Sequence, residues 1–141
     1  MKVSDYIAQF LEKNQIPFVF EMSGGMITHL LDSISQKSKI KIISLRHEQS
    51  AAFAADVFGR LTGIPGIALA TSGPGATNLI TGIGSSYFDS SPTIFITGQV
   101  NRNEIKGNSQ VRQLGFQETD IVSIVTPITK KAFLITNPTD V

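Results

Sequence analysis

The chain has 141 residues, a length that fits one domain with a core of its own. Hydrophobic residues make up 41% of it and charged residues only 16%, which excludes a mainly disordered chain. The net charge of +1 is too small for a nucleic-acid binder, and the lack of cysteine excludes a disulfide scaffold and a cysteine nucleophile. No apolar run reaches about 18 residues and the N-terminus lacks a signal-peptide pattern, so we expect a soluble cytoplasmic domain that does not bind a membrane.

Segments with helical and extended patterns alternate along the chain. Four segments are predicted to be helical: residues 4–14, 27–34 and 48–61, and a stretch after Gly75 that runs through Ile83. Short apolar runs between them predict strands at residues 17–22, 40–45, 66–71 and 93–97, with a short fifth strand at 132–135. This alternation predicts an α/β fold, with a doubly wound, mostly parallel sheet and helices on both faces.

The distribution of charge and proline adds three expectations. From residue 61 to residue 101 the only charged side chain is Asp89, so this segment forms either the core of the sheet or both core and subunit interface. The polar run 99–113 predicts a long loop. Residues 137–141 have the polar and proline residues that open a helix, yet no helix follows. We therefore expect residues 1–141 to be one domain, truncated near its C-terminal end.

Ligands of open α/β sheets bind beyond the carboxyl ends of the strands. Three segments are predicted to lie there, at residues 23–25, 46–49 and 71–78. The last of them is not a phosphate-binding loop, because it lacks the lysine of a Walker motif and has Asn78 where a dinucleotide fingerprint needs glycine. It is predicted to be a tight strand-to-helix turn with Pro74 near the first helical position.

Glu48 is the candidate with the clearest chemistry. It follows an apolar strand and precedes an alanine-rich helix, a setting that strips water from a carboxyl and favours its neutral form. The alternative is a helix N-terminal glutamate that only satisfies backbone N–H groups. His29 and His47 are isolated from any carboxylate at metal-ligand spacing, so we predict structural roles for both and no metal site.

Several of these segments together resemble a known family. They are Arg46-His47-Glu48-Gln49 with the alanine-rich helix, residues 71–78 (Thr-Ser-Gly-Pro-Gly-Ala-Thr-Asn), residues 95–100 (Phe-Ile-Thr-Gly-Gln-Val) and Phe116-Gln117-Glu118. In these motifs the chain resembles the N-terminal pyrimidine-binding domain of thiamin-diphosphate-dependent enzymes. Among these enzymes it is most similar to the acetolactate synthase (acetohydroxyacid synthase) large subunit. The likeness covers essentially the whole chain.

The resemblance implies roles for particular residues. Glu48 would hydrogen-bond N1′ of the cofactor's aminopyrimidine and share a proton with it, so that the thiazolium carbon can be activated. The other cofactor-binding positions would be Gly25, Thr71, Pro74 and Asn78. Gln117, as a second catalytic residue, and Phe116 would lie on the substrate side.

The resemblance also implies partners. The chain would act in a homodimer or homotetramer, facing a diphosphate-binding domain of a partner subunit that holds Mg²⁺ through a Gly-Asp-Gly motif absent here. The enzyme would be a 2-oxo acid decarboxylase and carboligase of branched-chain amino acid biosynthesis. Its substrate would be a small 2-oxo acid, and FAD could accompany thiamin diphosphate in the full-length enzyme.

The sequence departs from the synthase pattern at two places. Glu21-Met22-Ser23-Gly24-Gly25 stands where synthases usually have Gly-Tyr-Pro-Gly-Gly, and the 101–114 loop is several residues longer. Both departures lie near the cofactor and substrate side. Two alternatives therefore stay open: another thiamin-diphosphate decarboxylase or lyase, and a non-catalytic assembly domain of the same fold.

Overall fold

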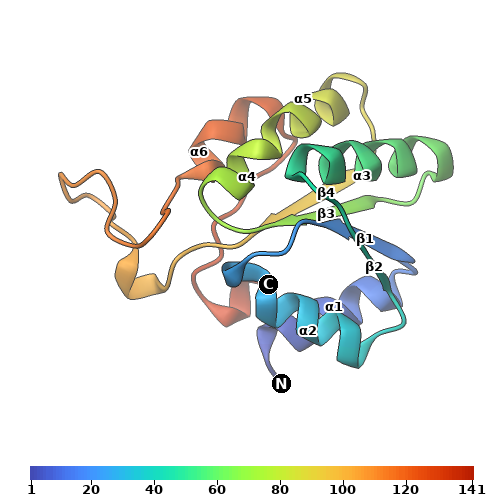
Figure 1. The fold of residues 1–141 in the computed structure, drawn as a ribbon, viewed down its shortest axis with the longest axis horizontal. Helices are drawn as coiled ribbons and strands as arrows, with labels where there is room; N and C mark the ends of the chain where they lie inside the picture. The colour runs from blue at the N-terminus through green and yellow to red at the C-terminus, as the bar shows by residue number, and fades with distance from the viewer.

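A computed structural model describes all of residues 1–141 and shows a four-stranded, fully parallel sheet (Figure 1). The strands are β1 (Phe18–Glu21), β2 (Lys41–Ser44), β3 (Gly66–Ala70) and β4 (Thr93–Thr97), in the spatial order β2-β1-β3-β4. The strand order reverses between β1 and β3, which is where open parallel sheets bind ligands.

Helices cover both faces of the sheet, which confirms the predicted doubly wound architecture (Figure 1). Helices α1 (Val3–Lys13) and α2 (Thr28–Lys37) lie on one face. The other face carries α3 (Glu48–Thr62), α4 (Pro74–Asn78), α5 (Ile80–Phe88) and α6 (Ile121–Val125). Four short 3₁₀ turns complete the chain: Gly25–Ile27, Arg102–Glu104, Thr126–Ile128 and Pro138–Asp140. None of the helices is long and apolar enough to cross a membrane.

The core consists of two clusters separated by the sheet, and β3 contributes to both. Ile67 and Leu69 pack with α1 and α2, whereas Ala68 and Ala70 pack with α3, α5 and α6. This division follows from the two-residue period of a strand. The small side chains on the second face let α3 lie very close to β3. A Cβ atom on Gly66 would lie only 1.9 Å from the carbonyl oxygen of Ala55.

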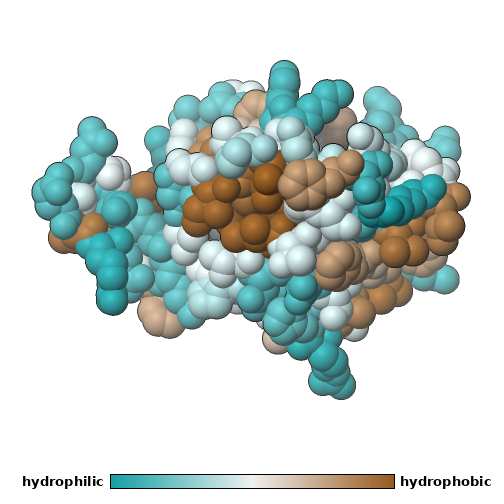
Figure 2. All heavy atoms as spheres, turned by 90° about the horizontal axis from the view of Figure 1, so that it is seen from above, coloured by the Kyte–Doolittle hydropathy of each residue, from teal (hydrophilic) through white to brown (hydrophobic).

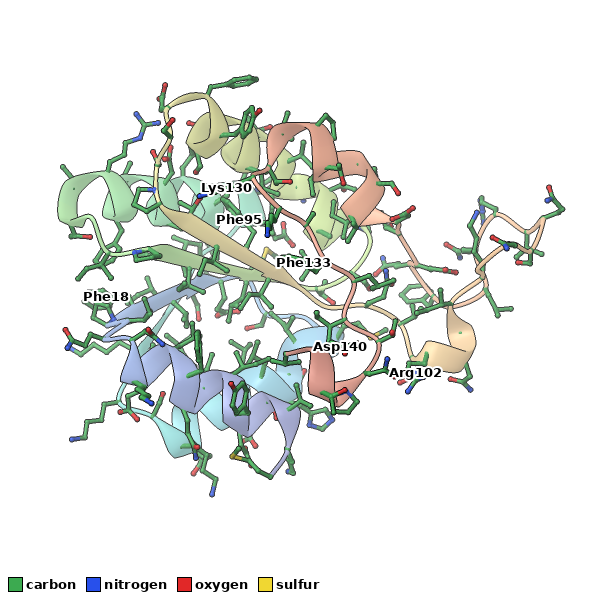
Figure 3. All side chains as sticks on the ribbon, turned by 180° about the vertical axis from the view of Figure 1, so that it is seen from behind. Phe18, Phe95, Arg102, Lys130, Phe133 and Asp140 are labelled. Carbon is green, nitrogen blue, oxygen red and sulfur yellow. The ribbon has the colours of Figure 1, made fainter.

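The predicted fifth strand at 132–135 is wrong. Residues 131–136 have no regular secondary structure and make no backbone–backbone hydrogen bond. Figure 3 shows the reason, because this segment passes from Lys130 on the α6 side of the sheet, past Phe133, to Asp140 on the α1–α2 side. It crosses between layers rather than running along β4, and Phe133 stays 69% exposed.

The charge-poor segment divides between interior and surface. All five residues of β3 are buried, as expected for the middle of a parallel sheet. Strand β4 is the edge strand, and its Ile94 is 43% exposed. The segment is therefore only partly core in the isolated chain.

The predicted loop at 99–113 is confirmed as an extended excursion away from the sheet (Figure 1). The carboxylate of Glu118 organises it by accepting hydrogen bonds from the backbone N–H groups of Lys106 at 2.7 Å and Leu114 at 2.9 Å. The N–H groups of Leu114 and Lys106 lower the pKa of Glu118 below its ordinary value. Glu118 thus joins the two ends of the 106–114 part of the loop.

Asp56 anchors α3 to α5. It accepts hydrogen bonds from Arg60 at 3.1 and 3.0 Å and from Ser85 at 2.9 Å, while Arg60 also pairs with Asp89. Burial raises the pKa of Asp56, but the hydrogen bonds and charge of Arg60 and the Ser85 hydroxyl outweigh burial and lower this pKa to about 2. The ionised form is therefore the one that the folded chain prefers.

We expect this anchor to lose its effect in acid. A lowered pKa stabilises the fold above the unfolded value of 3.8, and the gain disappears as the pH falls through about 2. At 1.36 kcal/mol per pKa unit, the contribution is about 2 kcal/mol. Urea unfolding of Asp56→Asn should show that loss at neutral pH and almost none near pH 2. A loss that is equal at both pH values would contradict this, and Asp89→Asn, at an exposed position, is the control with a small effect.

Candidate functional site

The turn after β1 rests on Thr71. The Met26 N–H donates a hydrogen bond to Thr71 Oγ1 at 3.3 Å, and a Cβ on Gly24 would lie 2.5 Å from Thr71 Cβ. Thr71 directly follows β3, so this contact joins the carboxyl ends of two neighbouring strands. Gly25 is different, because a Cβ atom there would meet nothing within 4 Å. Its backbone faces open space.

Glu48 begins α3 and is 8% exposed. Its Oε2 accepts a hydrogen bond from Asn78 Nδ2 at 2.9 Å, while Oε1 accepts none from within the chain. The helix cap comes instead from His47, whose Nδ1 accepts from the Gln49 N–H at 3.1 Å. The structural role predicted for His47 is confirmed, and the Glu48 carboxyl makes no hydrogen bond to the helix backbone.

Gly75 links the two halves of this arrangement. A Cβ at that position would lie 2.7 Å from Thr71 Cγ2 and 3.3 Å from Glu48 Oε1. The Gly24–Gly25 turn, Thr71, Gly75 and Glu48 thus form one continuous cluster at the carboxyl edge of the sheet. Pro74 opens α4, as predicted, and Asn78 ends it. This short helix brings the Asn78 amide within hydrogen-bond distance of the Glu48 carboxyl, 30 residues away in sequence.

Gln117 joins the cluster from the far end of the long loop. A Cβ on Gly73 would lie 2.6 Å from the Gln117 Cβ, so the glycine makes room for the glutamine. Gln117 has a φ of 58°, a left-handed conformation that costs a non-glycine residue free energy and occurs mostly where the surroundings impose it. Its neighbour Phe116 is 74% exposed and projects from the chain.

One residue of this edge, Glu21, escaped prediction as a site residue. Glu21 ends β1 and is only 1% exposed, and its carboxyl accepts hydrogen bonds from Ser23 and Ser44. Its position at the carboxyl end of an apolar strand was a signal that could have identified it. Beside it lies an open hollow of about 590 Å³, lined by Met22, Ser23, Ser44, Leu45 and Arg46.

The arrangement can present one carboxyl oxygen to a ligand. Glu48 is oriented by Asn78 through Oε2, which leaves Oε1 available to donate or accept a hydrogen bond. Glycines line the approach, and glycine is the residue that lets backbone come closest to a ligand. No group of three or more His, Asp or Glu side chains that could hold a metal ion exists in the structure.

Comparison with known proteins shows the family of the chain. Residues 1–124 match the family model described as thiamine pyrophosphate enzyme, N-terminal TPP binding domain. The acetolactate synthase large subunit of Cyanidium caldarium is 44% identical over 138 residues, which cover 96% of the chain and 23% of that protein. The probable acetolactate synthase large subunit of Methanocaldococcus jannaschii is 42% identical over 141 residues, 100% of the chain and 23% of that protein. Acetolactate synthase 2 of Nicotiana tabacum is 39% identical over 140 residues, 99% of the chain and 20% of that protein. The chain thus spans about a fifth of the length of these relatives.

Proposed function

Because the chain belongs to the thiamine pyrophosphate enzymes, as their N-terminal TPP binding domain, we propose that it forms the pyrimidine-binding half of the cofactor site in an enzyme of the acetolactate synthase type. One observation carries this proposal. Glu48 Oε1, on a largely buried carboxyl oriented by Asn78, has no partner within the chain and lies at the glycine-lined edge of the sheet.

The residues present fit an aminopyrimidine ring. A flat heteroaromatic ring needs an approach without side chains, and Gly25, where a Cβ would meet nothing within 4 Å, supplies that open space. It also needs a hydrogen-bonding group for its ring nitrogen, which Glu48 Oε1 supplies. The charge balance of +1 and the lack of a P-loop lysine fit a site that receives the neutral end of the cofactor rather than its diphosphate.

Each residue then has a distinct task. Thiamin diphosphate, when bound, supplies a nucleophilic carbon for decarboxylation and carbon–carbon bond formation. Glu48 holds a proton at Oε1 for the ring nitrogen, and Asn78 fixes the orientation of the carboxyl through Oε2. Thr71 holds the Gly25 turn through the Met26 N–H. Gln117, with Phe116 beside it, faces the substrate.

The complete enzyme needs more than residues 1–141. We propose that another domain binds the diphosphate and Mg²⁺, that FAD can accompany the full-length enzyme, and that the substrate is a small 2-oxo acid of branched-chain amino acid biosynthesis. Residues 1–141 alone would be inactive, because they offer neither a P-loop lysine nor an acidic metal-binding loop to the diphosphate. Another thiamin-diphosphate decarboxylase or lyase remains the second candidate, favoured by the Glu21-Met22-Ser23 departure at the edge of the site.

Gly25→Ala in the full-length protein tests the ring site. The added methyl group meets nothing in the isolated chain, so the free energy of unfolding should change by less than about 0.5 kcal/mol. It would occupy the space proposed for the ring, so the Kd for thiamin diphosphate should rise by about 10–200-fold. Calorimetric titration with Mg²⁺ present measures this. Gly84→Ala, where a Cβ meets only ordinary contacts at 3.8 Å and beyond, is the matched control. Equal affinities of Gly25→Ala and Gly84→Ala would contradict the proposed site.

We also propose that the helix layer formed by α3 to α6 packs against a second subunit, in a homodimer or homotetramer. Figure 2 looks onto this layer and shows hydrophobic surface between polar margins. Exposed large apolar side chains here are Phe53, Val57, Leu61, Tyr87, Phe88 and Ile124. The three on α3 recur every four residues and so form one stripe. The solution mass of the full-length protein tests this assembly.

A further inference from the structure

Glu21 is a buried carboxyl without a basic partner. It is 1% exposed, and neither of the two salt bridges in the structure involves it. Acidic side chains are almost never fully buried unless they are paired. Its only side-chain hydrogen bonds come from two hydroxyls, Ser23 Oγ to Oε2 at 2.9 Å and Ser44 Oγ to Oε1. The role of this buried carboxyl therefore depends on the segments to which the two serines belong.

The two serines belong to different parts of the cofactor edge. Ser23 lies in the turn that continues to Gly24 and Gly25. Ser44 ends β2, three residues before the cap of α3 and four before Glu48. The backbone ladder between these strands ends with the bond from the Leu45 N–H to the Glu21 carbonyl at 2.7 Å. Beyond it, no backbone hydrogen bond joins residues 22–25 to residues 45–48. The next connection between the turn and the end of β2 is the Glu21 side chain, through Ser23 and Ser44.

We propose that Glu21 is a positioning residue that fixes the Gly25 turn relative to the end of β2 and so to Glu48. Its carboxyl accepts from both hydroxyls at once, and this ties the turn to β2 where the sheet no longer does. The part of this inference that concerns cofactor binding rests on the proposed function. The part that concerns the turn itself does not.

Hydrogen exchange in the full-length protein without cofactor tests the positioning directly. The Met26 and Ile27 N–H groups report on the turn, because they donate to Thr71 Oγ1 and to the Gly24 carbonyl. Glu21→Leu removes both carboxyl hydrogen bonds with a side chain of similar size, and we expect these two amides to exchange about 10-fold faster. Amides of Ala68 and Leu69 in β3 should keep their rates. Glu21→Gln, whose amide can accept from one hydroxyl and donate to the other, should stay within about twofold of the wild type.

A double-mutant cycle with Ser44→Ala distinguishes one Glu21–Ser44 interaction that holds the turn from independent effects of the two side chains. If Ser44 acts through Glu21, Glu21→Leu/Ser44→Ala should be no faster in Met26 exchange than Glu21→Leu alone. Additive increases of the Met26 exchange rate in the double variant would contradict the proposal. So would an exchange rate that rises equally in the β3 amides, or a Met26 exchange rate that does not rise in Glu21→Leu. The Kd for thiamin diphosphate, measured on the same variants, should rise as the protection of the Met26 N–H from exchange falls. If wild-type protein does not bind the cofactor while the exchange pattern holds, the proposed function fails and the positioning role stands.

Discussion

Glu48→Gln in the full-length protein is expected to slow exchange of the thiazolium C2 proton of bound thiamin diphosphate by about 10²–10⁴-fold. Glutamine keeps the size of the side chain, and its amide oxygen can still accept from Asn78 as Glu48 Oε2 does. It cannot hold the carboxyl proton that we assign to Oε1. The fold should be barely disturbed, because the α3 cap is His47 rather than Glu48.

The measurement is deuterium exchange at C2, followed by NMR at saturating cofactor. Glu12→Gln is the matched control, because Glu12 Oε1 accepts from the Lys39 N–H and an amide oxygen can do the same. If Glu48 only interacted favourably with the helix dipole, its loss would cost about 0.3–1 kcal/mol of stability and leave C2 exchange unchanged. Equal exchange rates in the wild type and Glu48→Gln would therefore remove Glu48 from the chemistry.

Gly66→Ala is expected to destabilise the fold by about 1–3 kcal/mol or more. A Cβ there would lie 1.9 Å from the Ala55 carbonyl oxygen and 2.6 Å from its carbon. These are backbone atoms in the middle of α3, so relief requires the whole helix to move away from β3. Because α3 carries Glu48 at its N-terminal end, the same displacement should also weaken cofactor binding.

Urea unfolding measures the first effect and calorimetric titration the second. Gly25→Ala is the natural comparison, because its Cβ meets no atom within 4 Å and only cofactor binding should respond. A Gly66→Ala protein with an unchanged unfolding midpoint would mean that α3 can retreat from the sheet at little cost. Such a result would contradict the close packing of α3 on β3 that places Glu48.

Local sequence pattern alone predicted the four strands and the helices between them, except that the single helix expected after Gly75 is divided into α4 and α5 at Leu79. Strand β3 is an example, because a continuous apolar run with alternating large and small residues indicates a buried strand even when its neighbours are unknown. The segment 132–135 (Ala-Phe-Leu-Ile) is also a continuous apolar run and yet forms no strand. A strand exists only where another strand offers hydrogen-bonding groups, and here the chain crosses between helix layers (Figure 3).

The site divides in the same way. Residue type and position along the chain were sufficient to single out Glu48, because it follows an apolar strand and begins an alanine-rich helix. Thr71 and Asn78 were identified only through the resemblance to thiamin-diphosphate-dependent enzymes. Only the tertiary structure decided that Asn78 orients Glu48 across 30 residues of sequence, and that Glu21 joins Ser23 to Ser44. Propensity and hydrophobic period act over a few residues, whereas a hydrogen bond between distant side chains depends on how the strands and helices pack. The sequence by itself therefore determined the fold class and the chemistry carried by single residues, and the packing of the parallel sheet decided their partners.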